Sequence, residues 1–255
     1  MSEFTPQILR FESLPSTNLE AAIQAIEGAP EGLCIVASEQ TAGRGRLQRH
    51  WVSPKDAGLY FSIIVRPKFE QKVWPLLTLM AAIAAHDALL DACALETDIK
   101  WPNDILVNDK KICGILAETV ETPRGRAVVL GMGINLTKGS LPPELETVAT
   151  SVEAAGKQKP QLEIVLEALV RALVSNYEVL NQGDGPDEII RAWCARSSYG
   201  EGKLIRVNGS DESWVGTTRG LERDGALRVE TDREIRVVRA GDVTAIRPVR
   251  SVLSE

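Results

Sequence analysis

Hydrophobic positions along the chain follow two periods, one typical of strands and one typical of helices. Runs rich in Ile, Val, Tyr and Phe, bounded by Gly or Pro, predict strands at residues 32–38, 59–65 and 127–135. Apolar residues that recur every three or four positions predict helices at residues 74–93, 162–180 and 187–196. The first of these helices is dominated by Leu, Ala, Ile and Met, the composition of a helix packed on a sheet.

A shorter helix is predicted near the start of the chain. Thr17 and Glu20 have the spacing of a capping box, and Gly28 can end the helix. The apolar residues that recur at helical spacing between them are Leu19, Ile23 and Ile26. Ser16, Thr17 and Asn18 are therefore expected at the helix N-terminus, where free backbone N–H groups and the positive end of the dipole favour a polar or anionic ligand group.

Two polar segments interrupt the apolar pattern. Residues 40–51 are too polar and too rich in Gly for regular structure, and they predict a loop. Residues 99–117 predict a hairpin that turns at residues 108–110. This hairpin should bring Asn103 and Asp104, before the turn, close to Lys111, after it.

The pattern changes after residue 199. Short strand-type runs at 203–207, 213–218, 226–231 and 234–238 are separated by Asn-Gly, Asp-Gly and Asp-Arg turns. A stretch of about fifty residues with this pattern predicts a small β-barrel. We therefore expect two domains, residues 1–199 and residues 200–255.

Composition and charge narrow the functional classes. A chain of 255 residues with 44% hydrophobic and 25% charged residues is long enough for a large core. The net charge of -6 gives no general attraction to nucleic acid or to an anionic membrane. No apolar run reaches the roughly 18 residues of a spanning helix, and the first residues do not resemble a signal peptide, so we expect a cytoplasmic protein.

Cysteine and histidine give no sign of a metal site. Cys34, Cys93, Cys113 and Cys194 form no Cys-x-x-Cys pair, and we expect four buried, reduced thiols. The histidines are His50 and His86. Zinc-type ligand spacing is absent, and a histidine-dependent triad is poorly supported because one histidine lies in a polar loop and the other in an Ala-rich helix.

The segment Gly43-Arg44-Gly45-Arg46 suits an anionic ligand. Its glycines allow a close approach of the backbone, and each guanidinium offers a planar fork of donors to phosphate or carboxylate. Arg49 adds a third cation, so we expect a loop that is mobile when empty and ordered by an anion. The alternative is a solvated basic loop, which is the commoner structure of an isolated motif of this kind. Trp51 could be a core residue, or it could stack on adenine with roughly 1–3 kcal/mol.

Lys111 is a compact charge at the margin of an apolar strand and could lie between a carboxylate and a phosphate, with Gly114 leaving room for the ligand. The alternative is an exposed turn lysine. Asn103 and Asp104 could be turn residues, or Asp104 could deprotonate an amine or help to hold magnesium. The weak motif that ends the strand at 127–135 could admit a nucleotide and read its adenine edge; its residues are Gly131, Gly133 and Asn135.

Taken in chain order, these motifs resemble those of the biotin-protein ligases. The motifs are Ser16-Thr17-Asn18, Gln40-x-x-Gly43-Arg44-Gly45-Arg46-x-x-Arg49-x-Trp51, Lys100-Trp101-Pro102-Asn103-Asp104, Lys111-x-x-Gly114 and Gly131-x-Gly133-x-Asn135. The resemblance covers roughly residues 9 to 250, and five motifs in register are far more specific than any one of them.

The resemblance implies an α+β fold in which a central mixed β-sheet of the class II synthetase-like type is flanked by helices, with an SH3-like C-terminal barrel. It implies a ligase that activates biotin with MgATP to biotinyl-5'-AMP and pyrophosphate, then transfers biotin to a lysine of a carboxylase carrier domain and releases AMP. Biotin, ATP and Mg are the implied small molecules, and the metal enters with ATP.

Residue roles follow from the same resemblance. The residues implied for biotin are Ser16, Thr17, Asn18, Gln40, Gly43, Arg44, Gly45, Arg46, Lys111 and Gly114. Of these, the first four would hold the ureido group. Arg44, Gly45 and Arg46 would line the site where carboxylate meets phosphate, and Lys111 would bridge the carboxylate and the α-phosphate. Those for the nucleotide are Arg46, Arg49, Trp51, Asn103, Asp104, Gly131, Gly133 and Asn135. Lys111, Arg44, Arg46 and Asp104 are the expected catalytic residues, and Asp104 would meet the acceptor lysine.

Two departures qualify the resemblance. Gln48 stands where family members usually carry Gly, so we expect a stiffer loop. Only 15 residues precede Ser16, so the N-terminal helix-turn-helix of the repressor type, and with it operator binding, is not expected. Monomers and dimers both occur in the family, and no apolar stripe decides between them here.

Two other functions stay open at this point. A lipoate-protein ligase resembles the family in fold and acyl-adenylate chemistry but would lack this arginine loop. A non-catalytic sensor of biotin or adenylate is the second, and the intact set of Arg44, Arg46, Asp104 and Lys111 argues against it.

Overall fold

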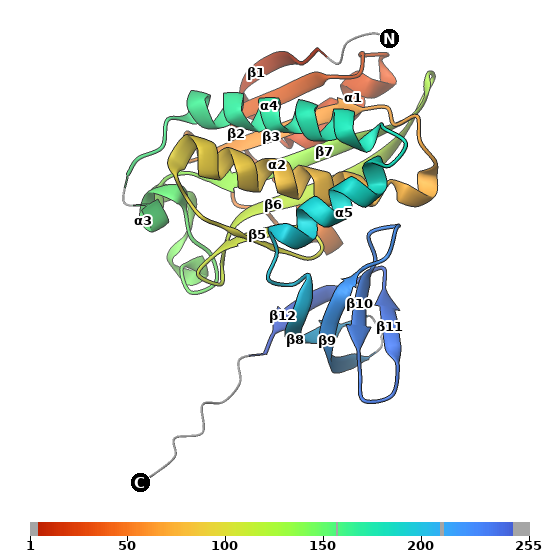
Figure 1. Cartoon of the computed structure of the whole chain (residues 1–255). Helices are drawn as coiled ribbons and strands as arrows, with labels where there is room; N and C mark the ends of the chain where they lie inside the picture. Colours follow the sequence, from red (N-terminus) through yellow and green to blue (C-terminus); the bar gives the residue numbers. More distant parts are fainter. Residues whose placement is uncertain (1–4, 157, 210–211, 247–255) are drawn as a thin grey trace.

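The computed structural model describes residues 5–156, 158–209 and 212–246. A seven-stranded mixed sheet has the order β1-β2-β3-β7-β6-β5-β4 (Figure 1). Its strands are β1 (Gln7–Leu14), β2 (Leu33–Gln40), β3 (Gly58–Val65), β4 (Asp98–Lys100), β5 (Asp104–Val107), β6 (Lys110–Thr122) and β7 (Gly125–Asn135). Only β1 and β2 pair in parallel, and the other neighbours in this sheet are antiparallel.

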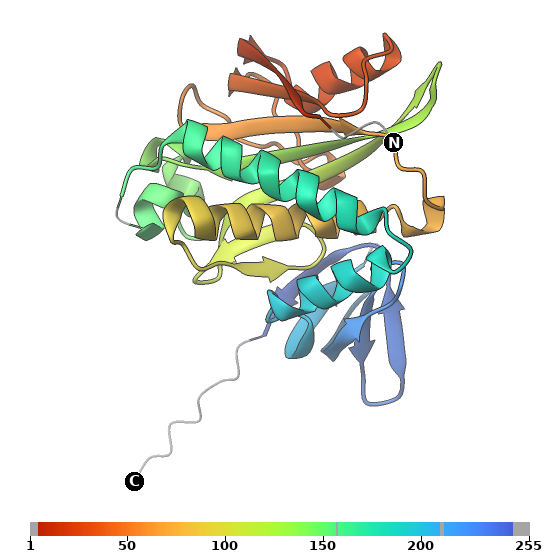
Figure 2. The same cartoon turned by 45° about the horizontal axis from the view of Figure 1, so that its top comes forward.

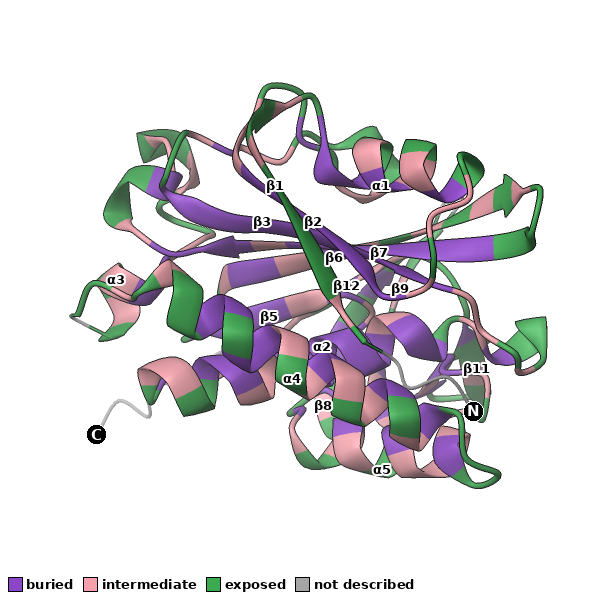
Figure 3. Ribbon diagram, turned by 90° about the horizontal axis from the view of Figure 1, so that it is seen from above, coloured by how far each residue is buried: buried purple, intermediate pink, exposed green. Residues whose placement is uncertain are grey.

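Helices cover both faces of this sheet. The longer ones, on one face, are α2 (Leu76–Cys93), α4 (Leu162–Leu180) and α5 (Gly185–Ala195), whereas α1 (Thr17–Ile26) packs on the other face (Figures 2 and 3). The small residues Ala21 and Ala25 let α1 lie close to the sheet. A short helix α3 (Val152–Gly156) follows two 3-10 turns, Lys138–Ser140 and Pro143–Leu145.

The strands and helices predicted from hydrophobic period are confirmed, with boundaries shifted by a few residues. The predicted hairpin is formed by β5 and β6, which turn at Asn108 and Asp109. Ile99 lies instead in a separate short strand, β4, because the chain turns at residues 101–103. The fold class is confirmed: an α+β sheet domain flanked by helices, followed by a separate antiparallel sheet.

The start of α1 differs from the prediction. The N-cap is Ser16, which makes no side-chain cap bond, so the capping box is wrong. The Thr17 hydroxyl lies 3.1 Å from Gln40 Oε1, and Glu20 accepts from Gln24. The face that packs on the sheet is formed by small residues, and the aliphatic residues that recur at helical spacing are exposed; they are Leu19, Ile23 and Ile26.

The C-terminal sheet has five strands in the order β11-β10-β9-β8-β12. They are β8 (Glu201–Asn208), β9 (Ser213–Leu221), β10 (Leu227–Glu230), β11 (Ile235–Val238) and β12 (Asp242–Ala245). The four predicted strands are present, and β12 was missed because its four residues carry little apolar pattern. Trp101 Nε1 donates to the Gly225 carbonyl at 3.0 Å and so joins this sheet to the larger domain.

Helix α2 corrects one expectation from the sequence. By length and composition it is apolar enough to cross a membrane, with a mean hydropathy of 1.5. However, 61% of it is buried, and it packs against both the sheet and the neighbouring α4, so it is a core helix. The four cysteines are free, but only Cys34 and Cys113 are buried; Cys93 and Cys194 are partly exposed, contrary to expectation.

Candidate active site

One open cavity lies on the α1 face of the sheet, in front of the N-terminal end of α1. It holds about 1140 Å³ of empty space, part of it open to solvent at the mouth. Every residue assigned a role by the resemblance lines this cavity except Gly43. Gly43 instead lets the two limbs of the loop meet, because an added Cβ would meet Trp51 O and, at 2.8 Å, Ser53 Oγ.

The end of the cavity nearest α1 is a buried polar network. Gln40 Oε1 accepts from the Thr17 backbone N–H at 2.8 Å, and its amide nitrogen donates to Ser53 at 2.9 Å. Ser62 Oγ lies 2.8 Å from Thr17 Oγ1 and 2.6 Å from Asn18 Oδ1. These side chains are therefore held in fixed orientations before any ligand arrives.

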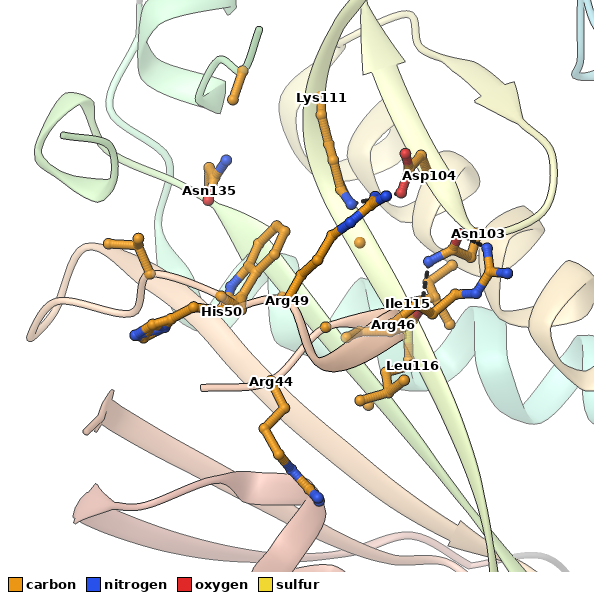
Figure 4. A pocket seen from close by; sticks show the side chains of 18 of the residues that line it. Arg44, Arg46, Arg49, His50, Asn103, Asp104, Lys111, Ile115, Leu116 and Asn135 are labelled. Atoms are coloured by element: carbon orange, nitrogen blue, oxygen red, sulfur yellow. Dashed lines mark hydrogen bonds and ion pairs between the residues drawn. The ribbon is translucent and has the colours of Figure 1, made fainter. Parts of the chain in front are cut away.

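Arg44 belongs to this same end of the cavity. Its guanidinium donates to Glu118 Oε2 at 3.1 Å, and that oxygen also accepts from Asn18 Nδ2 at 2.7 Å. Figure 4 shows Arg44 directed away from Lys111 and Asp104. Arg44 and Lys111 therefore lie at opposite ends of one cavity in this structure, where Glu118 binds Arg44.

Arg46 and Arg49 are bound by the C-terminal sheet. Arg46 Nη1 donates to Asn103 Oδ1 at 3.0 Å and lies 3.5 Å from Asp242 Oδ1, while Arg49 donates to Asp242 Oδ2 at 2.5 Å. Each loop arginine thus has an acidic partner. The expectation of three cations repelling each other in an unsupported loop is wrong in this respect.

Lys111 forms the cationic centre of the other end of the cavity. Its Nζ lies 2.6 Å from Asp104 Oδ1 and 5.3 Å from the centroid of the Trp51 ring. Lys100 Nζ is a second, more distant cation, 3.8 Å from Asp104 Oδ2. Asp104 therefore lies between two ammonium groups, and each of its carboxylate oxygens faces one of them.

The neighbouring thiol cannot act as a nucleophile at neutral pH. Cys113 lies on β6 two residues from Lys111, and burial raises the pKa of its thiol to about 12. Lys111 acts in the opposite direction on this pKa, but burial dominates. The thiol is thus protonated in any physiological buffer.

The glycines of the cavity floor make room for protein side chains. A Cβ at Gly131 would collide with the Asn18 amide, and one at Gly133 would collide with the Trp51 indole. At Gly114 it would lie 2.9 Å from Lys111 Cε and 3.0 Å from Trp51 Cζ3. The expected direct room for a nucleotide or ligand is therefore occupied here by Asn18, Trp51 and Lys111.

One wall of the cavity is formed by the segment after β7. Asn135 Nδ2 donates to the Thr150 carbonyl at 3.1 Å, and the Lys111 backbone bonds to Val148 O at 3.0 Å and to Thr150 N at 2.9 Å. The apolar side chains of this segment that line the cavity are Leu141, Leu145, Val148 and Ala149. Asn135 is thus engaged by backbone and holds this wall against β7.

Gln48 has a left-handed backbone, with φ at 59°, and its neighbour Leu47 has φ at 55°. Glycine adopts this conformation without steric cost, whereas other residues lose roughly 1–2 kcal/mol there. The position where the resemblance leads us to expect Gly is therefore one where Gly suits the backbone.

Three residues of the site were missed by sequence reasoning: Ser62, Glu118 and Asp242. Ser62 lies within an apolar strand, and a single polar residue in such a strand is a signal of a buried hydrogen-bond partner. In the structure Ser62 is 0% exposed. Glu118 lies beyond the motif that contains Lys111, and Asp242 lies in another domain. Among residues 5–156, 158–209 and 212–246, no three His, Cys, Asp or Glu side chains gather as a metal-binding group.

Comparisons with known proteins agree with the motifs. Residues 9–135 match the model of the biotin/lipoate A/B protein ligase family. The chain is 35% identical to the bifunctional ligase/repressor BirA of Bacillus subtilis, over 92% of this chain and 73% of the relative. It is 32% identical to the biotin–[acetyl-CoA-carboxylase] ligase of Mycobacterium tuberculosis, over 91% and 86%.

A solved structure is also similar: the biotin protein ligase from Aquifex aeolicus in complex with biotin and ATP. The TM-score is 0.82 at 25% identity, covering 95% of this chain and 99% of the other. The chain therefore belongs to the biotin/lipoate A/B protein ligase family. Its place in that family is among the biotin-protein ligases, as its motifs predicted.

Proposed function

We propose that the chain activates biotin with MgATP, giving biotinyl-5'-AMP and pyrophosphate, and then transfers biotin to one lysine of a carboxylase carrier domain with release of AMP. The observation that supports this most is that five motifs from distant parts of the chain line a single cavity. The cavity is polar and cationic where two anions have to meet. Neither a lipoate ligase nor a sensor is favoured by the relatives.

The polar end of the cavity suits the ureido group of biotin. Ser16, Thr17, Asn18 and Gln40 supply hydroxyl and amide groups that can both donate and accept. Ser16, Thr17 and Asn18 lie at the N-terminus of α1, and Gln40 ends β2 beside them. Arg44 and Gly45 would cover this end from the loop.

The cationic end suits the reacting groups. Lys111 would bridge the biotin carboxylate and the α-phosphate, and so reduce the repulsion between the two anions. Arg46 and Arg49 would bind the nucleotide phosphates, and Trp51 would stack on adenine while its indole lies over Gly133. Asn103 would orient Arg46, and Asn135 would support the adenine side of the cavity.

Asp104 would serve the second step. Its carboxylate is paired with Lys111 and could accept a proton from the incoming lysine amine as that amine attacks the mixed anhydride. The bond between the carbonyl carbon and the phosphate oxygen then breaks, and AMP leaves. Magnesium would enter with the nucleotide, since both carboxylates at the cavity, Asp104 and Asp242, are engaged by cations.

We also propose that residues 1–199 form the catalytic domain and residues 200–255 a separate barrel that helps to bind ATP or the carrier. Support comes from Asp242 of β12, which lines the cavity and keeps Arg46 and Arg49 beside it until the nucleotide displaces this carboxylate. The four free thiols suit the reducing cytoplasm as the compartment.

Transfer of radiolabelled biotin to an isolated carrier domain in the presence of MgATP tests the function. Label on the carrier, and biotinyl hydroxamate when hydroxylamine replaces the carrier, are expected. Acid-dependent AMP release with lipoate but not with biotin would indicate the lipoate ligase instead. Binding of biotin without hydroxamate or labelled carrier would indicate a sensor.

A further inference from the structure

Glu118 does not line the cavity, but it contacts two residues at the polar end that we propose for biotin, Asn18 and Arg44. It lies on β6, and its Oε2 accepts from Asn18 Nδ2 at 2.7 Å and from Arg44 Nη2 at 3.1 Å. Asn18 belongs to α1 and is 4% exposed, whereas Arg44 belongs to the loop after β2. One carboxylate oxygen therefore joins the helix N-terminus to the loop that covers the cavity.

The first consequence concerns the orientation of the Asn18 amide. Its nitrogen faces the Leu116 carbonyl at 3.2 Å and Glu118, both acceptors, and its oxygen faces Ser62 Oγ at 2.6 Å. A flipped amide would place its oxygen against a carboxylate, which is repulsive. Glu118 thus fixes which end of the amide faces Ser62, and the Ser62 hydroxyl has to donate to it.

That orientation propagates to the residues proposed to bind biotin. A serine hydroxyl has one hydrogen, so if Ser62 donates it to Asn18, Ser62 cannot also donate to Thr17. Any hydrogen bond between the two hydroxyls then uses the hydrogen of Thr17. Thr17 Oγ1 lies 2.8 Å from Ser62 and 3.1 Å from Gln40 Oε1, which already accepts from the Thr17 N–H. The pattern of donors and acceptors at the cavity end therefore depends on a carboxylate two strands away from Ser62.

The second consequence concerns the loop. Arg44 pairs with His50 in an isolated bridge, and the Trp51 N–H donates to Gly43 O at 2.9 Å, so the base of the loop is closed. An ion pair at Arg44 fixes this base relative to β6. Glu118 thereby limits where the loop, and with it Trp51, can lie.

We propose that Glu118 is a positioning residue for biotin: its carboxylate aligns the Asn18 amide and holds the loop at Arg44, without touching either substrate. The proposal rests on the proposed function. It implies that loss of this charge weakens biotin binding more than it affects ATP binding or the chemical step.

The test is Glu118→Gln, which keeps the shape and removes the charge, measured by biotin-dependent ATP–pyrophosphate exchange. We expect the KM for biotin to rise roughly five- to tenfold, because a charge-assisted bond to a buried amide and a partly exposed ion pair are both lost. The kcat and the KM for ATP should change by less than about twofold.

Glu121→Gln is the matched control. Glu121 lies on the same strand, is exposed, and pairs with Arg126 at 2.5 Å, away from the cavity. This variant loses the same charge and an arginine partner but should keep the wild-type KM for biotin. Trypsin, which cleaves after Arg44, Arg46 and Arg49, should cut the loop several times faster in Glu118→Gln than in Glu121→Gln.

The outcomes separate the proposals. A wild-type protein without exchange activity would contradict the proposed function itself. An active wild type together with equal biotin KM in the two glutamine variants would overturn the role of Glu118. If Glu118→Gln folds poorly, Glu118→Asp is the variant to measure, because it keeps the charge on a shorter side chain. Its KM for biotin should lie between those of the wild type and Glu118→Gln. If the role of Glu118 is purely structural, the melting temperature of Glu118→Asp should fall while the KM for biotin stays unchanged.

Discussion

Lys111 is the cation that we propose to bridge two anions, the biotin carboxylate and the α-phosphate. Its ammonium is paired with Asp104 at 2.6 Å and lies over Trp51. The Asp104 pair keeps the charge at the cavity rather than in solvent. We propose that an incoming carboxylate and phosphate share this cation, and that Asp104 then becomes available for the acceptor amine.

Lys111→Ala should reduce biotin-dependent ATP–pyrophosphate exchange by at least on the order of a hundredfold, because the charge is most needed in the transition state. Biotin binding, measured by calorimetry, should weaken far less. Equal losses in binding and in exchange would contradict a transition-state role and would indicate that Lys111 acts mainly in holding biotin.

Gly133→Ala tests the space that Trp51 occupies. The added methyl group would collide with the indole, which would have to leave its position on β7. Because the indole is proposed to stack on adenine, the KM for ATP should rise roughly tenfold. Gly183→Ala is the control, since a Cβ there meets nothing within 4 Å. An unchanged KM for ATP in Gly133→Ala would mean that Trp51 does not contact the nucleotide.

At the level of elements, α1 shows that helical spacing does not identify the buried face. The aliphatic residues point to solvent, because the close distance between α1 and the sheet admits only small residues such as Ala21 and Ala25, both 0% exposed. The period and Gly28 predicted the helix and its C-terminal end, whereas the capping box predicted at its start is absent and its packing depends on the sheet below it.

Ala25→Leu should therefore destabilise the protein by about 1–3 kcal/mol, because extra methylene groups have no room between α1 and β2. Ile23→Gln on the outer face should change the free energy of unfolding by less than about 0.5 kcal/mol. Urea unfolding of both variants checks this. A larger effect for Ile23→Gln would mean that the outer face is covered in the folded protein.

Motifs close in sequence were predictable, and contacts between distant elements were not. The loop, the hairpin and the glycine strand each carry a local pattern, so their residues could be named before the structure. Glu118 meets Asn18 across 100 positions, and Asp242 meets Arg49 across 193. Nothing local in the sequence marks either acid, because only the strand order of the two sheets brings them to the cavity.

At the level of the whole molecule, the C-terminal sheet closes one side of the active site. Arg46 donates to the Gly241 carbonyl at 3.3 Å, and both Arg46 and Arg49 contact Asp242. A negative side chain thus occupies a place where phosphates are expected to bind. In the proposed binding mode the nucleotide would compete with Asp242 for Arg49, whose side chain is 66% exposed.

Asp242→Asn should lower the KM for ATP roughly two- to fivefold at low salt, because it removes a competing charge of a partly exposed pair. The difference should shrink as salt approaches about 1 M, where charges are screened within roughly 3 Å. Asp232→Asn, in the turn between β10 and β11, makes the same charge change away from the cavity and should leave the KM unchanged. A higher KM in Asp242→Asn would mean that Asp242 aligns the two arginines for the phosphates instead of competing with them, and the barrel would then assist nucleotide binding directly.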